Sequence, residues 1–295
     1  MLRQLLIILS IFVFSSAQAA NDKAFIWQVN SDDSVVYLTG SIHFADKSFY
    51  PLRQEIEDAF DRSKYLVVEL DINQIDHDSY NQLVSQKGAY KAGETIKDVI
   101  SEDTWLQLRQ RLEHLNIDYE AVKNFKPGIL VLTLSAAHAM QMGLDPQLGI
   151  DIHFLLKAAK KPKKQIIELE TLEQQIGLFL DMPNADLLLK ESLFSLDESE
   201  ALMADMVHYW KQGDESQMNK LLFEDAIDQY PAFTEIYDRL FYERNRQMTS
   251  KIEIMLKQQS TTKTSYFVVV GSGHLLGKKG IVNALTKKGY KVKRL

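Results

Sequence analysis

The sequence predicts an α/β (α+β) fold, in which βαβ units from the two ends of the chain build a central mixed β-sheet, with a large helical middle region between them. Two observations carry this prediction. An apolar run that ends in Gly-Ser-x-His occurs near each end of the chain, at residues 35–43 and 266–274. Each run is followed by a helical pattern and then by another short apolar run, which is the order of elements in a βαβ unit.

Length and composition fit a folded globular chain. The chain has 295 residues, 45% of them hydrophobic, which is enough for a full core. We predict a signal peptide at residues 1–20 and a single domain at residues 21–295. Within that domain the sheet halves are residues 21–72 and 262–295, and residues 73–261 are mainly helical.

The first twenty residues have the pattern of a secretory signal. Arg3 precedes an apolar run at residues 5–14, and Ala17-Gln18-Ala19 has the small residues of a cleavage site. The run is too short to span a bilayer comfortably, and the alternative is a buried amphipathic helix. We therefore expect an exported protein, periplasmic or secreted, that starts near Ala20 or Asn21 and has no stable membrane insertion after cleavage.

Charge and cysteine content exclude several classes of function. The formal net charge is −6 and there is no basic stretch, so we expect no binding of nucleic acid or of an anionic membrane. Cysteine is absent, which excludes disulfides, a thiol nucleophile, iron–sulfur sites and a lipid-modified cysteine.

The remaining elements follow from local patterns. Two apolar runs flank a turn-rich cluster at residues 30–34, which predicts a hairpin and makes the sheet mixed. Later apolar runs predict strands at residues 65–70, 165–171 and 290–292. Helical patterns occur at residues 51–62, 80–86, 101–115, 125–142, 150–160, 185–212, 233–256 and 278–288. We interpret residues 185–212 as two helical pieces and residues 233–256 as the longest helix.

Two histidines and an acid are expected at one edge of the sheet. His43 and His274 each follow a glycine at a strand tip, and Glu69 interrupts an apolar strand near its end. Because ligands collect at the carboxyl ends of parallel strands, these side chains should meet there. Two imidazoles and a carboxylate suit a divalent metal with an open position, whether zinc, manganese, cobalt or iron. One alternative is that the two histidines are unrelated polar residues that cap strand ends. Another is that Asp71, rather than Glu69, is the acid at this edge.

Further polar residues lie where apolar ones are expected. Arg244 and Asn245 fall on the apolar stripe of the predicted helix 233–256, and buried polar groups are costly unless they are hydrogen-bonded. They are therefore expected to face a polar site, although an arginine can also snorkel from the edge of such a stripe. Glu170 ends the strand 165–171 and is either a base behind the site or a helix N-terminal acid.

These motifs together resemble the TraB/PrgY/GumN family, which is related to the Tiki proteases and, more distantly, to erythromycin esterases and ChaN-like proteins. They cover nearly the whole chain, in the family's order, at residues 37–43, 68–71, 149–151, 169–171, 243–245 and 270–277. The resemblance implies a central mixed sheet, with both Gly-x-x-His motifs in one cleft. For the Tiki branch it implies a divalent-metal-dependent peptidase that favours manganese or cobalt.

The resemblance also implies the roles of individual residues. His43, His274 and Glu69 carry over as the metal-site residues, and Arg244 with Asn245 as the polar pair borne on a helix. Asp151 and Glu170 lie within matching motifs, so the candidate catalytic residues are Arg244, Asn245, Glu170 and Asp151.

The first hypothesis is an exported metal-dependent hydrolase, a peptidase with a peptide or protein substrate. A divalent ion (manganese, cobalt or zinc) would acidify water, and Arg244 would stabilise the oxyanion. One alternative is a non-catalytic protein that binds or sequesters a peptide or pheromone. Another is a metal-free, esterase-like hydrolase in which His43 or His274 is the general base.

Overall fold

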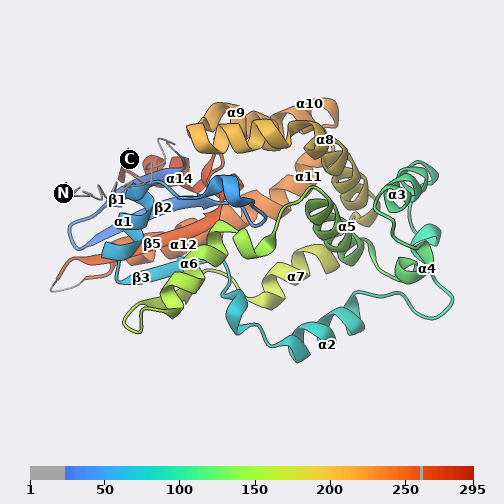
Figure 1. The fold of residues 1–295 in the computed structure, drawn as a ribbon, viewed down its shortest axis with the longest axis horizontal. Helices are drawn as coiled ribbons and strands as arrows, with labels where there is room; N and C mark the ends of the chain where they lie inside the picture. The colour runs from blue at the N-terminus through green and yellow to red at the C-terminus, as the bar shows by residue number, and fades with distance from the viewer. Residues whose placement is uncertain (1–23, 260–261) are drawn as a thin grey trace, which may run out of the picture.

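A six-stranded mixed sheet forms one end of the molecule, and most of the helices gather at the other end (Figure 1). The computed structural model describes residues 24–259 and 262–295, so the predicted signal peptide lies outside the described residues. The strand order is β4-β3-β5-β2-β1-β6. The strands are β1 Ile26–Asn30, β2 Ser34–Ser41, β3 Tyr65–Val68, β4 Gln165–Glu168, β5 Thr264–Gly271 and β6 Lys291–Arg294.

The centre of the sheet joins the two ends of the chain. β2 and β5 run parallel over their full length, from Ser34 opposite Thr264 to Ser41 opposite Gly271. β3 runs parallel to β5, and β4 runs parallel to β3. All four of these strands therefore end at the same edge of the sheet, which confirms the predicted α/β fold.

The outer strands confirm the predicted hairpin and show how the two predicted βαβ units are arranged. β1 pairs antiparallel with β2, which is the predicted hairpin, and β6 pairs antiparallel with β1. The two predicted βαβ units contain α1 (Gln54–Arg62) and α14 (Ile281–Lys287). Their strands are not neighbours, however, because β5 lies between β2 and β3, while β6 is separated from β5 by β2 and β1. Each unit is completed by strands from the opposite end of the chain.

The middle of the chain is helical, as predicted. Its principal helices are α2 His77–Lys87, α3 Glu102–His114, α4 Tyr119–Val122, α5 Pro127–Gln141, α6 Ile150–Ala159, α7 Leu172–Leu180, α8 Ala185–Gln212, α9 Glu215–Asn219, α10 Asp225–Gln229, α11 Phe233–Tyr237 and α12 Glu243–Lys257. Short 3-10 turns η1 to η4 lie at Lys47–Phe49, Ile72–Gln74, Ile96–Asp98 and Pro146–Leu148, and π-helical turns η5 and η6 lie at Lys220–Glu224 and Asp238–Tyr242. No helix among residues 24–259 and 262–295 is long and apolar enough to cross a membrane.

Two of the predicted helices differ in detail. Residues 185–212 form the single 28-residue helix α8 rather than two pieces, since the segment contains neither glycine nor proline to break it. α8 is therefore longer than any element within residues 233–256. That second segment is divided by the π-helical turn η6 into α11 and α12. Such turns shift the register of a helix and are frequent at functional sites.

Separate buried clusters hold the sheet and the helices. Around the sheet, Phe60 of α1 and Phe154 of α6 pack on Phe267 of β5, with ring centroids 5.7 and 4.7 Å from that ring. A second cluster, centred on Leu108, Leu134 and Leu189, joins helices α3, α5 and α8. The prediction of a single domain stays a prediction.

Candidate active site

The carboxyl edge of the four parallel strands brings the predicted site residues together. His43 follows β2 by two residues, Glu69 follows β3 directly, and Glu170 lies two residues beyond β4. His274 lies in the short helix α13 (Ser272–Leu275), which begins directly after β5. Because these strands are parallel and in register, four segments far apart in the sequence end side by side.

Gly271 marks the point where three of these side chains converge. A β-carbon built on this glycine would lie 3.5 Å from Oε1 of Glu69, 3.5 Å from Cδ2 of His274 and 3.8 Å from Nε2 of His43. The missing side chain thus leaves a recess bordered by both imidazoles and the carboxylate. As expected, the fold brings the two Gly-Ser-x-His motifs close to each other.

Each imidazole is oriented through its Nδ1 atom. Nδ1 of His43 lies 2.9 Å from Oδ2 of Asp151, and Nδ1 of His274 lies 2.6 Å from Oδ1 of Asn245. The amide of Asn245 also donates through Nδ2 to the carbonyl of Lys279 at 3.0 Å, so its Oδ1 must accept from His274. Both rings therefore carry a proton on Nδ1, and when neutral they present the lone pair of Nε2 to the recess.

Glu69 is held from two sides. Oε1 accepts the backbone N–H of Gly271 at 2.7 Å and lies 3.8 Å from Nε2 of His274, while Oε2 accepts from Nη2 of Arg244 at 2.6 Å. Burial opposes ionisation, but the charges of His274, His43 and Arg244 and the Gly271 N–H hold the pKa of Glu69 down to about 2. The carboxylate is therefore ionised at neutral pH.

Arg244 connects Glu69 to Glu170. Its Nε and Nη2 donate to the two oxygens of Glu170 at 2.8 and 2.6 Å, and its Nη1 donates to the carbonyl of Leu240 at 2.9 Å. Gln175 donates to Oε2 of both carboxylates, at 3.3 and 3.1 Å. The guanidinium has five N–H groups, and these contacts leave one of them, on Nη1, for a substrate. Glu170 therefore lies behind the site as a partner of Arg244.

The two histidines differ in charge. Burial lowers the pKa of His274 to about 4, so this ring is neutral at pH 7. Burial also acts to lower the pKa of His43, but the hydrogen bond and charge of Asp151, together with the charge of Glu69, raise the pKa to about 9. The His43 side chain is 57% exposed because it borders an open cavity, so solvent weakens these interactions. Neutral His274 therefore has no charge that could lower the pKa of Glu69 at pH 7. The charges of Arg244 and His43 still lower it.

The side chains are of the types that bind divalent cations. As the described residues are placed, however, no group of three or more His, Cys, Asp or Glu side chains is close enough to hold one. Nε2 of His274 and Oε1 of Glu69 are 3.8 Å apart, within the roughly 4.2 Å that two ligands of one such ion can span. Two buried oxygens nearby, Oδ1 of Asp151 and Oγ of Ser41, have no hydrogen-bond partner among the described residues. To bind such an ion together, the two imidazoles and the carboxylate would have to move closer to one another.

A cavity of about 420 Å³, which we call the site cavity, gives a substrate access to these groups. Its polar part is formed by His43, Glu69, Arg244 and His274. Its wider, apolar part is lined by Ile42, Leu132, Leu178, Phe179, Met206, Met218, Leu222 and Phe241. An apolar cavity with a few converging polar groups is the usual form of a small-molecule or peptide-side-chain site.

Comparison with known proteins identifies the family. Residues 25–294 match the model of the TraB/PrgY/gumN family. The chain belongs to this family. It is 27% identical to the uncharacterized protein YbaP of Escherichia coli over 250 residues, which are 84% of this chain and 87% of YbaP.

More distant similarity joins this family member to named proteases. It is 24% identical to the metalloprotease TIKI2 of Xenopus tropicalis over 328 aligned residues, covering 91% of this chain and 59% of the relative. It is 21% identical to the human metalloprotease TIKI1, covering 93% of this chain and 62% of the relative. The chain thus spans about three fifths of the length of these metalloproteases. No solved structure is significantly similar to it.

Some residues of the site were not assigned a role from the sequence of this family member. Gln175, one turn into α7, links the two carboxylates, and nothing local distinguishes it from a surface glutamine. Ser41 and Ser272 occupy the same position in the two Gly-Ser-x-His motifs, and Oγ of Ser272 donates to the carbonyl of Ser41 at 3.0 Å. The serine repeated in both motifs was the sequence signal that could have identified this pair. The structure shows that a hydrogen bond between the two serines joins the motifs.

Proposed function

We propose that the chain is an exported, metal-dependent hydrolase that cleaves peptides. The observation that carries the proposal is the matched pair of partners on the Nδ1 atoms, Asp151 on His43 and Asn245 on His274. They leave Nε2 of neutral His274 available beside Glu69, and Nε2 of His43 becomes available once that ring gives up its proton to an incoming cation. Metal-ligating histidines characteristically have such a partner on the other ring nitrogen. The similarity to proteins named metalloproteases supports the same reaction class.

Hydrolysis of a peptide bond joins the oxygen of water to the carbonyl carbon, breaks the C–N bond and moves a proton to the leaving amine. A manganese, cobalt or zinc ion at His43, His274 and Glu69 would polarise the carbonyl and lower the pKa of water to about 7. The substrate carbonyl oxygen would accept from the remaining Nη1–H of Arg244, a type of contact worth roughly 3 kcal/mol in the transition state.

The other candidate catalytic residues position these groups. Asp151 and Asn245 fix the two imidazoles, and Glu170 fixes the guanidinium of Arg244. The apolar part of the site cavity excludes water around a bound peptide, which strengthens each of these polar interactions. The substrate class that suits such a cavity is a peptide with apolar residues close to the cleaved bond.

Peptide cleavage with and without a chelator tests the proposal. We expect a peptide library to be cut by the purified chain, cleavage to stop with chelator, and activity to return with manganese, cobalt or zinc. His43→Ala and His274→Ala should abolish both cleavage and tight metal binding. His208→Ala, a change at an exposed histidine of α8, is the matched control and should retain both.

Two other results would contradict the proposal and identify the alternatives. Cleavage that is unaffected by chelator would indicate metal-free hydrolysis, with His274 as the neutral imidazole that accepts a proton. Tight binding of peptides without any turnover would indicate a protein that sequesters them.

Export is part of the proposal and has its own test. The signal-like residues 1–20 lead us to propose that the mature chain begins near Ala20 or Asn21, in the periplasm or outside the cell. Mass spectrometry of the N-terminal peptide from the native host would check this. Retention of Met1 in the active protein would contradict it.

A further inference from the structure

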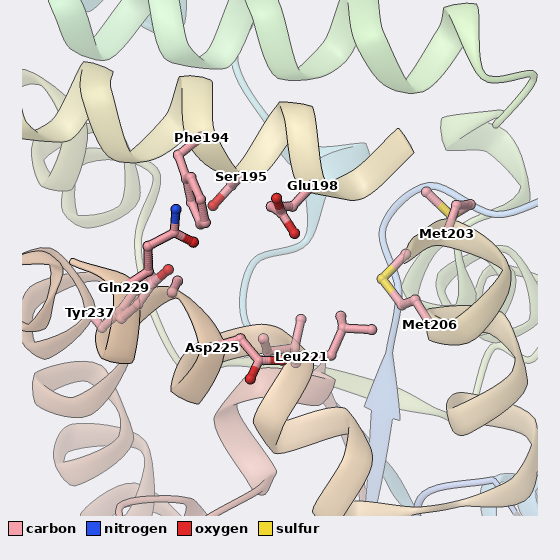
Figure 2. Close-up of a pocket in the computed structure, with 11 residues that line it drawn as sticks. Phe194, Ser195, Glu198, Met203, Met206, Leu221, Asp225, Gln229 and Tyr237 are labelled. Atoms are coloured by element: carbon pink, nitrogen blue, oxygen red, sulfur yellow. The ribbon is translucent and has the colours of Figure 1, made fainter. Parts of the chain in front are cut away.

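A second cavity, of about 240 Å³, lies beside the site cavity. Apart from the two residues that it shares with the site cavity, its residues have no role in the proposed mechanism. We call it the side cavity. It lies between α8 on one side and the segments η5, α10 and α11 on the other, and Figure 2 shows the labelled side chains arranged around this space. Met206 and Leu222 line both cavities, so the two share a wall.

The walls of the side cavity are mainly apolar and adaptable. They are formed by Phe194, Met203, Met206, Leu221, Leu222 and Ala226. Methionine is flexible and fills irregular spaces, so this surface can adjust to the shape of a ligand. Since an apolar cavity of about 150 Å³ already accommodates benzene, a cavity of about 240 Å³ accommodates an amino-acid side chain.

Among the described residues, the charged side chains that line the side cavity are acidic. Glu198 and Asp225 line it, together with the uncharged Gln229, and no lysine, arginine or histidine whose side chain the structure describes does so. Asp225 lies 3.8 Å from Nζ of Lys220 at the surface. Among the described residues no cationic side chain is paired with Glu198, whose carboxylate therefore depends on solvent or on a ligand.

A third carboxylate lies behind this lining. Ser195 and Tyr237 line the side cavity, and each donates its hydroxyl proton to Oε1 of Glu191 at 2.8 Å. Glu191 is only 6% exposed and has hydroxyl partners but no cation among the described residues. Because the two hydroxyl protons are engaged, the hydroxyl oxygens can only accept hydrogen bonds from a ligand.

We propose that the side cavity is a subsite for a lysine or arginine side chain of the peptide substrate. The aliphatic stem would pack on the methionine and leucine walls, and the cationic end would reach Glu198, Asp225 and the two hydroxyl oxygens. An anionic side chain meets the like charges of Glu198 and Asp225 there, with the amide of Gln229 as a neutral donor. This inference rests on the proposed function, since the shared wall of Met206 and Leu222 places the basic residue next to the bond that is cleaved.

Binding measured without turnover tests the subsite. The probes are three blocked peptides, Ac-Ala-Ala-X-Ala-NH2, in which X is lysine, norleucine or glutamate. With chelator present, the methyl signal of Met203 reports binding by NMR, because Met203 lines the side cavity and not the site cavity. We expect the lysine peptide to bind about 10-fold more tightly than the norleucine peptide, the ratio for one good charge-assisted contact, and the glutamate peptide to bind weakest.

Two variants with matched controls assign this preference to the cavity. Leu221→Trp fills the side cavity and should abolish the Met203 response, whereas Ile254→Trp, at a 69% exposed position of α12, should not. Glu198→Gln should reduce the preference for lysine over norleucine to about 3-fold or less, whereas Glu113→Gln, at an exposed position of α3, should leave it intact. Circular dichroism confirms that each variant is folded, and if Leu221→Trp does not fold, Glu198→Gln decides.

The outcomes separate this inference from the proposed function. Equal binding of the lysine and norleucine peptides, a preference for glutamate, or an unchanged preference in Glu198→Gln would overturn the subsite while leaving peptide hydrolysis intact. Lysine-selective binding without any hydrolysis in the chelator and metal experiments would support the subsite and contradict the hydrolase.

Discussion

Oδ1 of Asn245 lies 2.6 Å from Nδ1 of His274, and Nδ2 of the same amide donates to the carbonyl of Lys279 at 3.0 Å. One side chain of α12 therefore fixes both the orientation of the imidazole in α13 and the loop that follows it. Asn245 is 1% exposed, so neither bond is replaced by water if the amide is removed.

Asn245→Ala should weaken metal binding more than it weakens the fold. Loss of the partner on Nδ1 releases the ring and its tautomer, which typically costs roughly 10- to 100-fold in metal affinity or activity. The unpaired Lys279 carbonyl and imidazole should cost about 1–3 kcal/mol of unfolding free energy. Metal titration and urea denaturation measure the two effects. Asn283→Ala, which removes an amide bonded to a backbone carbonyl outside the site, is the control, and equal metal affinity in both variants would contradict the role of Asn245.

Gly271→Ala should keep the fold and lose the site. The backbone of Gly271, with φ −49° and ψ 138°, accepts alanine, and the new methyl would make contacts of 3.5 Å or more. It would nevertheless occupy the recess between His43, Glu69 and His274. We expect an unchanged melting temperature with metal binding and peptide cleavage reduced at least about 100-fold, measured side by side with Gly177→Ala, whose methyl would approach only Asp181. A fully active Gly271→Ala protein would show that the three groups do not act on a common ion.

Arg244→Met should destabilise the protein. The guanidinium of Arg244 pairs with both Glu69 and Glu170, which are only 7% and 6% exposed. Removing one partner of a buried ion pair typically costs about 3–5 kcal/mol. Urea denaturation should show this loss, and Arg246→Met, at a neighbouring exposed arginine of α12, should show almost none. Equal stability of the two variants would mean that the carboxylates are protonated or solvated without Arg244.

Glu57→Gln should lower stability at neutral pH but not in acid. Glu57 of α1 accepts from Nε2 of His153 at 2.8 Å and from Nζ of Lys157, both on α6. Burial acts to raise the pKa of Glu57, but these hydrogen bonds and charges lower it below 4.5. A lowered folded-state pKa stabilises the fold fully above the unfolded value, and the contribution is lost as the pH falls through the folded value.

The corresponding measurement is the unfolding free energy of both proteins from pH 7 to pH 3. The difference between wild type and Glu57→Gln should be largest above pH 4.5 and should shrink below it. Glu55→Gln, at an exposed position of the same helix, should show a small difference. A difference that grows in acid would contradict the assigned direction of the pKa shift.

The sequence by itself determined the parts of the fold that depend on neighbouring residues. Two apolar runs and the turn cluster between them predicted the hairpin of β1 and β2, and a glycine at each strand tip marked His43 and His274. The conflict between polarity and an apolar pattern singled out Glu69, Arg244 and Asn245. These signals are local, because periodicity and backbone freedom are properties of a few consecutive residues.

Only the tertiary structure decided which strands are neighbours and which polar groups are partners. β5 lies between β2 and β3, and this pairing joins residues more than 190 positions apart, for which no local pattern exists. The same folding puts Asp151 on His43, Gln175 between two carboxylates and a π-helical turn before Arg244. Long-range pairing is chosen by the burial and hydrogen bonding of the whole chain at once, so the identity of each residue is visible in the sequence while its partner is not.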